Sequence, residues 1–319
     1  MPVYNGSDFQ PPSRYKNAHY STLIPYLLGK SPQINYKRTR IDTDDGDFLD
    51  LDCLLADNKK IAILCHGLEG SSQSGYVVLF ADHLHRKGWD VISINYRGCS
   101  GEANRKLQMY NSGMTEDVHT AITYAEKDYD DIVLCGFSLG GNIVLKYGGE
   151  GTYKLSPKIR SIVAISAPLD LYNSSIELLR WQNILYQWNF LLSLSSKIIK
   201  KKKQFPKEVQ LSKLLKCRTL YKFDDHFTAP MFGYKDAADY YNQNASIQWL
   251  DKINHPTLII NAKDDPFLGS KCYPVDLAAS LDNVHLYTPD YGGHVGFAYS
   301  RNDRSWLIKK VEEFVNQYL

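Results

Sequence analysis

From residue 61 onward, short β-branched apolar runs alternate with stretches of helical periodicity, and this alternation restricts the possible folds more than any other feature. Apolar runs without a polar face are typical of strands that are buried on both sides. Buried strands that alternate with helices predict an α/β fold, in which helices cover both faces of a mostly parallel sheet. Eight strands are expected, at residues 36–42, 47–55, 61–65, 90–95, 132–136, 161–166, 257–262 and 283–287.

The first two of these strands are joined by Asp44-Asp45-Gly46-Asp47. An Asp-Gly pair between two alternating runs predicts a β-hairpin, so the sheet is expected to begin with an antiparallel pair. Helices are expected near residues 74–88, 114–128, 139–149, 269–281 and 303–318.

The long interval between the strands at 161–166 and 257–262 breaks this rhythm, because it contains no clear strand pattern. Its first part is rich in Trp and Leu and its second part is rich in Lys, and both are helical in pattern. We expect a helical cap or lid inserted over the carboxyl edge of the sheet. The expected organisation is a first core segment at 1–166 with an N-terminal arm at about 1–30, the cap at 167–230, and a second core segment at 231–319.

A glycine-flanked serine follows the predicted strand at 132–136, in the sequence Gly136-Phe137-Ser138-Leu139-Gly140, and a helical pattern comes directly after it. A G-x-S-x-G motif between a strand and a helix indicates a sharp turn that exposes a nucleophilic serine. The flanking glycines allow the strand and the helix to approach without a Cβ clash. The alternative is a glycine-rich turn that contains a serine by chance.

A serine needs a base, and in folds with this turn the acid and the histidine follow the serine along the chain. His294 lies in a glycine-rich loop after the last predicted strand, and we select it as the base. Two acids, Asp264 and Asp265, follow the strand at 257–262. We select Asp265 as the acid because it lies further along the loop, and we keep Asp264 as the alternative, with a local role in shaping the turn.

The segment His66-Gly67-Leu68-Glu69-Gly70 follows the predicted strand at 61–65. A loop at this place supplies one backbone N–H of an oxyanion hole, and the residue after the nucleophile supplies the other. This predicts the N–H groups of Leu68 and Leu139 as the two donors. For the side chain of His66 we favour a structural role that braces the loop.

The total charge of +2 excludes a surface built throughout for polyanions, and we expect no nucleic-acid partner. Residues 197–218, however, hold nine Lys/Arg side chains against Glu208, a local charge of +8, so the rest of the chain carries −6. The run Lys200, Lys201, Lys202 and Lys203 is either a solvated face or a weak contact with an anionic membrane surface.

Apolar residues also recur at helical spacing in the predicted cap, and we favour a helix that packs this stripe on the body over a lid that receives an acyl chain. The stripe consists of Leu178, Leu179, Trp181, Ile184, Leu185, Trp188, Leu191 and Leu192.

Six cysteines without CxxC spacing predict neither a disulfide framework nor a metal site. No signal-peptide pattern and no membrane-spanning pattern is visible, so a cytoplasmic protein is expected. No G-x-G-x-x-G motif follows a strand, and no metal or organic cofactor is expected. The sequence makes no prediction of the oligomeric state.

Several blocks of the chain together resemble the YheT-like branch of the α/β-hydrolases, also called family four, over nearly the whole length. The blocks are 45–52 (DGDFLDLD), 66–72 (HGLEGSS), 95–104 (NYRGCSGEAN), 110–117 (YNSGMTED), 223–233 (FDDHFTAPMFG) and 261–268 (NAKDDPFL). One departure is Asn111, where this family commonly has His. Eukaryotic members are often membrane-anchored lipid hydrolases, and this chain resembles the soluble bacterial type.

The resemblance implies an α/β-hydrolase fold and a serine carboxylesterase with Ser138, Asp265 and His294 as the catalytic triad. The expected substrate is a small-molecule or lipid ester. A thioesterase or acyltransferase with the same triad is the alternative, and a non-catalytic scaffold is the third possibility.

Overall fold

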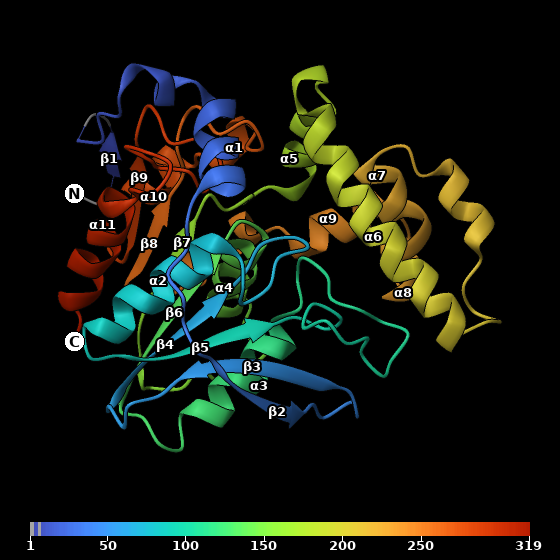
Figure 1. Ribbon diagram of the computed structural model, residues 1–319, viewed down its shortest axis with the longest axis horizontal. Coiled ribbons are helices and arrows are strands. Elements are labelled where there is room, and N and C mark those ends of the chain that lie inside the picture. The colour runs from blue at the N-terminus through green and yellow to red at the C-terminus, as the bar shows by residue number, and fades with distance from the viewer. Residues whose placement is uncertain (1–2, 6–7) are drawn as a thin grey trace.

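A nine-stranded sheet forms the centre of the computed structural model, which describes residues 3–5 and 8–319 (Figure 1). The strand order is β1-β9-β8-β7-β6-β4-β5-β3-β2. β3 is antiparallel to both β2 and β5, and the other neighbours are parallel. The strands are β1 (Val3–Asn5), β2 (Lys37–Asp42), β3 (Phe48–Leu54), β4 (Lys60–Cys65), β5 (Asp90–Asn95), β6 (Asp131–Phe137), β7 (Ile159–Ile165), β8 (Thr257–Ile260) and β9 (Val284–Thr288).

The eight predicted strands are present, and the sheet has one strand more than predicted. The extra strand is β1, which pairs with β9 in parallel, with Val3 opposite Leu286. A strand of three residues is too short to show an alternating pattern in the sequence. Residues 1–2 and 6–7 of the predicted N-terminal arm lie outside the described residues, and the described part of the arm continues into helix α1 (Ala18–Leu28).

The predicted hairpin is confirmed, since β2 and β3 pair antiparallel from Lys37 opposite Cys53 to Asp42 opposite Phe48. Gly46 in its turn has φ +85°, a conformation that glycine adopts at little cost.

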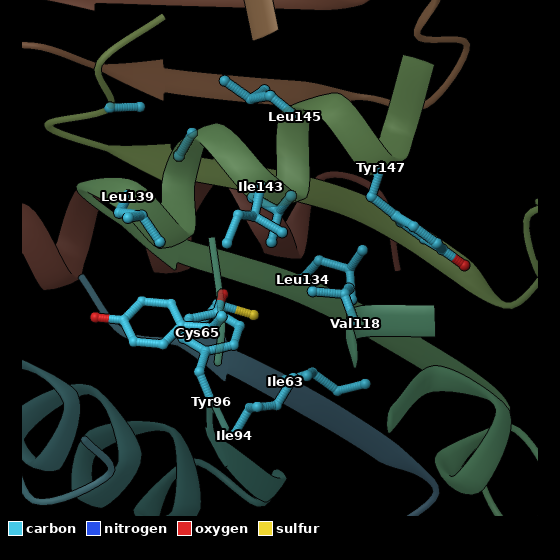
Figure 2. Packing of buried hydrophobic residues seen from close by; sticks show 14 of the residues in the cluster. Ile63, Cys65, Ile94, Tyr96, Val118, Leu134, Leu139, Ile143, Leu145 and Tyr147 are labelled. Carbon is cyan, nitrogen blue, oxygen red and sulfur yellow. The ribbon is translucent and has the colours of Figure 1, made fainter. Parts of the chain in front are cut away.

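The two faces of the sheet carry separate hydrophobic cores, and β4 contributes alternate side chains to both. Ile63 and Cys65 pack with helices α3 (Thr115–Ala125) and α4 (Leu139–Gly149) in one core, and Figure 2 shows them beside Val118 of α3 and Ile143 of α4. Leu64 belongs to the other core, which is closed by α2 (Gly75–Arg86) and α11 (Ser305–Asn316). This explains why β4 is a continuous apolar run: both of its faces are covered by helices.

The helices that cover the sheet are α2 (Gly75–Arg86), α3 (Thr115–Ala125), α4 (Leu139–Gly149), α10 (Val275–Ala279) and α11 (Ser305–Asn316). The single helix predicted at 269–281 is wrong: a 3-10 turn (Ser270–Cys272) precedes the short α10. Pro274, between the two, explains the break, because proline has no N–H to donate and disfavours helical geometry in the residue before it.

The chain between β7 and β8 is helical, as predicted, and lies to one side of the sheet, away from both termini (Figure 1). Its helices are α5 (Leu171–Leu178), α6 (Ile184–Gln204), α7 (Leu220–Phe223), α8 (Ala229–Met231) and α9 (Ala237–Asn244). The domain boundaries at 166 and 230 stay a prediction. We call the segment from α5 to α8 the cap.

The prediction that the apolar stripe of the cap packs on the body is wrong for most of its members. Helix α6 turns Leu191, Leu194 and Ile198 inward. Six members of the stripe are exposed, namely Leu179, Trp181, Ile184, Leu185, Trp188 and Leu192. The single helical spacing predicted for the stripe does not hold, because these residues are divided among α5, a 3-10 turn (Trp181–Asn183) and α6.

The four lysines at the end of α6, residues 200–203, differ in their exposure to solvent. Lys201 is only 2% exposed, and its ammonium donates to the backbone carbonyls of Asn104 and Lys106. Lys202 donates to carbonyls that follow the helix, which is a favourable place for a cation. Only Lys200 and Lys203 are exposed, so the predicted membrane contact through all four lysines is wrong for Lys201.

In the described part of the chain no helix has the length and apolar character needed to cross a membrane. All six cysteines are free, and Cys53, Cys65 and Cys135 are buried.

We predict that Gly140→Ala destabilises the protein by about 2 kcal/mol, because a Cβ at this position would lie 2.3 Å from the carbonyl oxygen of Cys65. The measurement is denaturant unfolding. Gly75→Ala in the first turn of α2 is the control, since its Cβ would meet only the flexible side chain of Ser31. Equal unfolding midpoints for the two variants would contradict the prediction.

Candidate active site

Ser138 occupies the tight turn between β6 and α4, at the carboxyl edge of the sheet. Its backbone has φ +53° and ψ −121°, which is strained for a residue with a side chain. The turn is possible because strand and helix approach closely: a Cβ at Gly136 would lie 2.2 Å from the carbonyl oxygen of Gly140. The predicted strand–turn–helix context of the serine is therefore present.

The structure brings His294 and Asp265 to this serine from the loops after β9 and β8. His294 Nε2 lies 2.8 Å from Ser138 Oγ, and His294 Nδ1 lies 2.9 Å from Asp265 Oδ2. The side chain of Asp265 is fully buried, and its Oδ1 also accepts a hydrogen bond from the backbone N–H of Phe267. The ring of Phe267 packs against the imidazole, with 4.1 Å between ring centroids.

The carboxylate of Asp264, the alternative acid, contacts a backbone N–H of the loop that carries His294. It does not contact the imidazole. Its Oδ1 accepts a hydrogen bond of 2.9 Å from the N–H of Gly293, a residue with φ +58°. Burial raises the pKa of Asp264 to about 7. Its role is thus to fix the turn before His294, rather than the turn of its own loop as expected from the sequence.

Helix α1 braces the histidine loop from the other side, a contact that sequence reasoning missed. The N–H of His294 donates to Thr22 Oγ1, and Ser21 Oγ donates to the carbonyl of Gly292. The N-cap residue Asn17 is the feature of the sequence that indicates a helix here, since its side chain caps α1. Pro25 inside the helix weakens the helical pattern that follows. The N-terminal arm therefore belongs to the site.

Leu68 and Leu139, whose backbone N–H groups are the predicted oxyanion donors, both line the cavity next to Ser138. No described residue accepts a hydrogen bond from the N–H of Leu68 or of Leu139. His66 is fully buried, and burial lowers its pKa to about 4, so it is neutral at pH 7. It contacts the carbonyl of Gly67 and the N–H of Tyr96, which is the bracing role expected for it.

Glu69 ties the loop that carries Leu68 to helix α6. Its backbone has φ +55°, and its N–H donates to the hydroxyl of Tyr110. Its buried carboxylate accepts hydrogen bonds from Tyr110, from Ser193 and from the ammonium of Lys197. The cap thus holds the residue that follows Leu68.

A cavity that is partly open to solvent contains Ser138 and His294 in its wall. Its lining is mostly apolar, and the cap supplies many of the residues. The apolar lining residues are Leu68, Met109, Leu139, Pro168, Leu171, Leu178, Phe190, Leu194, Leu220, Phe267 and Leu268. A largely apolar cavity with a few polar groups is typical of sites for small organic ligands.

Asn111, the departure from the family pattern, also lines the cavity, and its Oδ1 accepts a hydrogen bond from the N–H of Gly113.

Within residues 3–5 and 8–319, no group of three or more His, Cys, Asp or Glu side chains could hold a metal ion.

Residues 62–300 match the family model described as the alpha/beta hydrolase fold. The chain belongs to this family. The alpha/beta hydrolase is 31% identical to the Escherichia coli (strain K12) protein named "Putative esterase YheT", over 99% of this chain and 95% of that one. The predicted resemblance to YheT-like α/β-hydrolases is therefore confirmed.

Two further similarities extend this comparison. The hydrolase is 29% identical to phospholipase ABHD3 from Bos taurus, over 86% of this chain and 70% of that one. Among solved structures, an esterase from Pyrococcus furiosus superposes with a TM-score of 0.58 at 16% identity, over 92% of this chain and 99% of that one. At that identity the likeness shows the fold alone.

We predict that Asp264→Asn stabilises the protein relative to wild type increasingly as pH rises from about 4 to about 7. An unfolded Asp titrates near 4, whereas Asp264 in the folded protein titrates at about 7, so the stability that it contributes is lost as pH rises through this window. The measurement is the free energy of unfolding of both proteins at several pH values. A difference that stays constant with pH would refute the assignment.

Proposed function

We propose that this alpha/beta hydrolase is a serine esterase that cleaves carboxylic esters through an acyl-enzyme. One observation carries the proposal: Ser138 Oγ, the imidazole of His294 and the carboxylate of Asp265 form a continuous chain of contacts at the wall of the cavity. The names of the relatives, an esterase and a phospholipase, agree with ester hydrolysis.

In the proposed reaction, Ser138 Oγ attacks the ester carbonyl while His294 Nε2 takes the hydroxyl proton. The alcohol then leaves with that proton, and the acyl group stays on Ser138. Water attacks the acyl-enzyme, again with His294 as the base, and releases the carboxylic acid. The carboxylate of Asp265 orients the imidazole and stabilises its charged form in both steps.

The oxygen of the attacked carbonyl becomes negatively charged in the transition state. We assign its stabilisation to the N–H groups of Leu68 and Leu139, each worth roughly 3 kcal/mol. The assignment is supported by the position of both residues in the cavity wall and by the contacts that hold Glu69, which follows Leu68.

The mostly apolar lining favours small-molecule or lipid esters with an apolar acyl group. We also propose a cytoplasmic setting, which the six free cysteines support. Any weak contact with an anionic membrane would involve Lys200 and Lys203, the two exposed lysines of the run.

A fluorophosphonate probe, which reacts with activated serines, tests the nucleophile. We expect it to label the wild type and not Ser138→Ala, because no other serine in the described part of the chain contacts His294. Hydrolysis of nitrophenyl esters is measured on the same samples and should disappear together with labelling. Labelling that survives in Ser138→Ala would overturn the assignment.

Substitution of the neighbouring residues Asp264 and Asp265 tests which of them is the acid of the triad. We expect Asp265→Asn to lower kcat by about 10⁴-fold, the order of loss known for the acid of such a triad, because its carboxylate contacts His294 Nδ1. Asp264→Asn should cost less than about tenfold, since it contacts only the backbone of Gly293. Ester hydrolysis at saturating substrate provides kcat. A larger loss in Asp264→Asn would reverse the two roles.

A further inference from the structure

Asp224 places a carboxylate in the wall of the cavity that contains Ser138. It comes from the cap, in the single π-helical turn (Asp224–Thr228) that links α7 to α8. Such turns are rare and often occur at functional sites. Most of the exposed surface of the cavity wall is apolar, with Leu171 and Leu220 in it, and the polar lining residues besides Asp224 carry hydroxyl, amide or imidazole groups.

Two neutral hydroxyl groups hold this carboxylate. Thr228 donates to Asp224 Oδ1 at 2.6 Å, and Tyr241 donates to Asp224 Oδ2 at 2.5 Å. In the described part of the chain, no Lys, Arg or His forms an ion pair with Asp224. Burial raises the pKa of Asp224 to about 6, so at pH 7 and above most molecules carry the negative charge.

A carboxylate in a largely apolar cavity without a cation is costly, because two hydroxyl groups replace only part of its hydration. Each of its oxygens can accept more than one hydrogen bond, so capacity remains for a donor from a ligand. The neighbouring Asp225 differs in this respect, since it does not line the cavity and contacts the Lys222 ammonium and the N–H of Ala237.

We propose that Asp224 binds a hydrogen-bond donor of the substrate, a hydroxyl or an ammonium group, and makes the enzyme selective for esters that carry such a group. This inference rests on the proposed esterase function. The substrate class would then be an ester with one polar, proton-donating end, which Asp224 binds in the wall of the cavity.

The test compares Asp224→Asn with wild type on matched nitrophenyl esters whose acyl chains end in methyl, hydroxyl or ammonium, over a short series of chain lengths. A second series carries the same three end groups on the alcohol part, and release of the acid is followed. Asp225→Asn is the control variant, because it removes the same charge one residue away and outside the cavity.

We expect wild type to prefer the hydroxyl or ammonium esters, and Asp224→Asn to lose about tenfold or more in kcat/KM on them, through a higher KM, as befits a hydrogen bond to a charged group. The methyl esters should be unaffected, and Asp225→Asn should behave as wild type. If Asp224→Asn loses kcat/KM only on the ammonium esters, the substrate carries a cationic group. If it loses kcat/KM on the hydroxyl and the ammonium esters, a neutral hydroxyl is enough for binding to Asp224.

Equal effects on all three end groups, or no effect in either series, would overturn the proposal. Such a result would leave Asp224 as a structural residue that holds Tyr241 and Thr228. Fluorophosphonate labelling of Ser138 separates this failure from that of the esterase proposal. Normal labelling without end-group selectivity rejects only the role of Asp224, whereas absent labelling and absent hydrolysis in wild type reject the esterase function itself.

Discussion

The close approach of the α4 N-terminus to the ends of β4 and β6 is the constraint on which the candidate site depends. A Cβ at Gly140 would meet the carbonyl of Cys65, and one at Gly136 would meet that of Gly140. This packing keeps Ser138 in a strained conformation and brings the loop after β4 beside it, with 3.0 Å between an ideal Cβ on Gly67 and the Cβ of Ser138. Buried packing on both faces of the sheet supports the strain.

The parts of the fold that follow from local pattern could be predicted from the sequence. Continuous apolar runs identified the parallel strands, and the glycines around Ser138 identified the turn. The sequence distinguishes less well between Asp264 and Asp265 as the acid, because both follow the same strand. Only the path of the loop decides which carboxylate faces His294. In the structure Asp265 contacts the imidazole and Asp264 contacts the backbone of Gly293.

Other features depend on contacts between distant segments and leave no local signal. Lys201 reads as part of a charged run, yet it is buried because two backbone carbonyls near residue 105 accept its hydrogen bonds. The support of His294 by Thr22 joins segments 272 residues apart. A single helical period over residues 178–192 predicts a buried apolar stripe, but this segment forms three separate elements and leaves six of the apolar side chains exposed.

Glu69 shows that the cap is more than a cover for the cavity. It directly follows Leu68, the proposed oxyanion donor, and its carboxylate is held by Ser193 and Lys197 of α6 and by Tyr110. The pair of Glu69 with Lys197 is largely shielded from water, so separating it would leave a poorly solvated charge. The loop beside Ser138 and helix α6 are therefore held together through the contacts of Glu69.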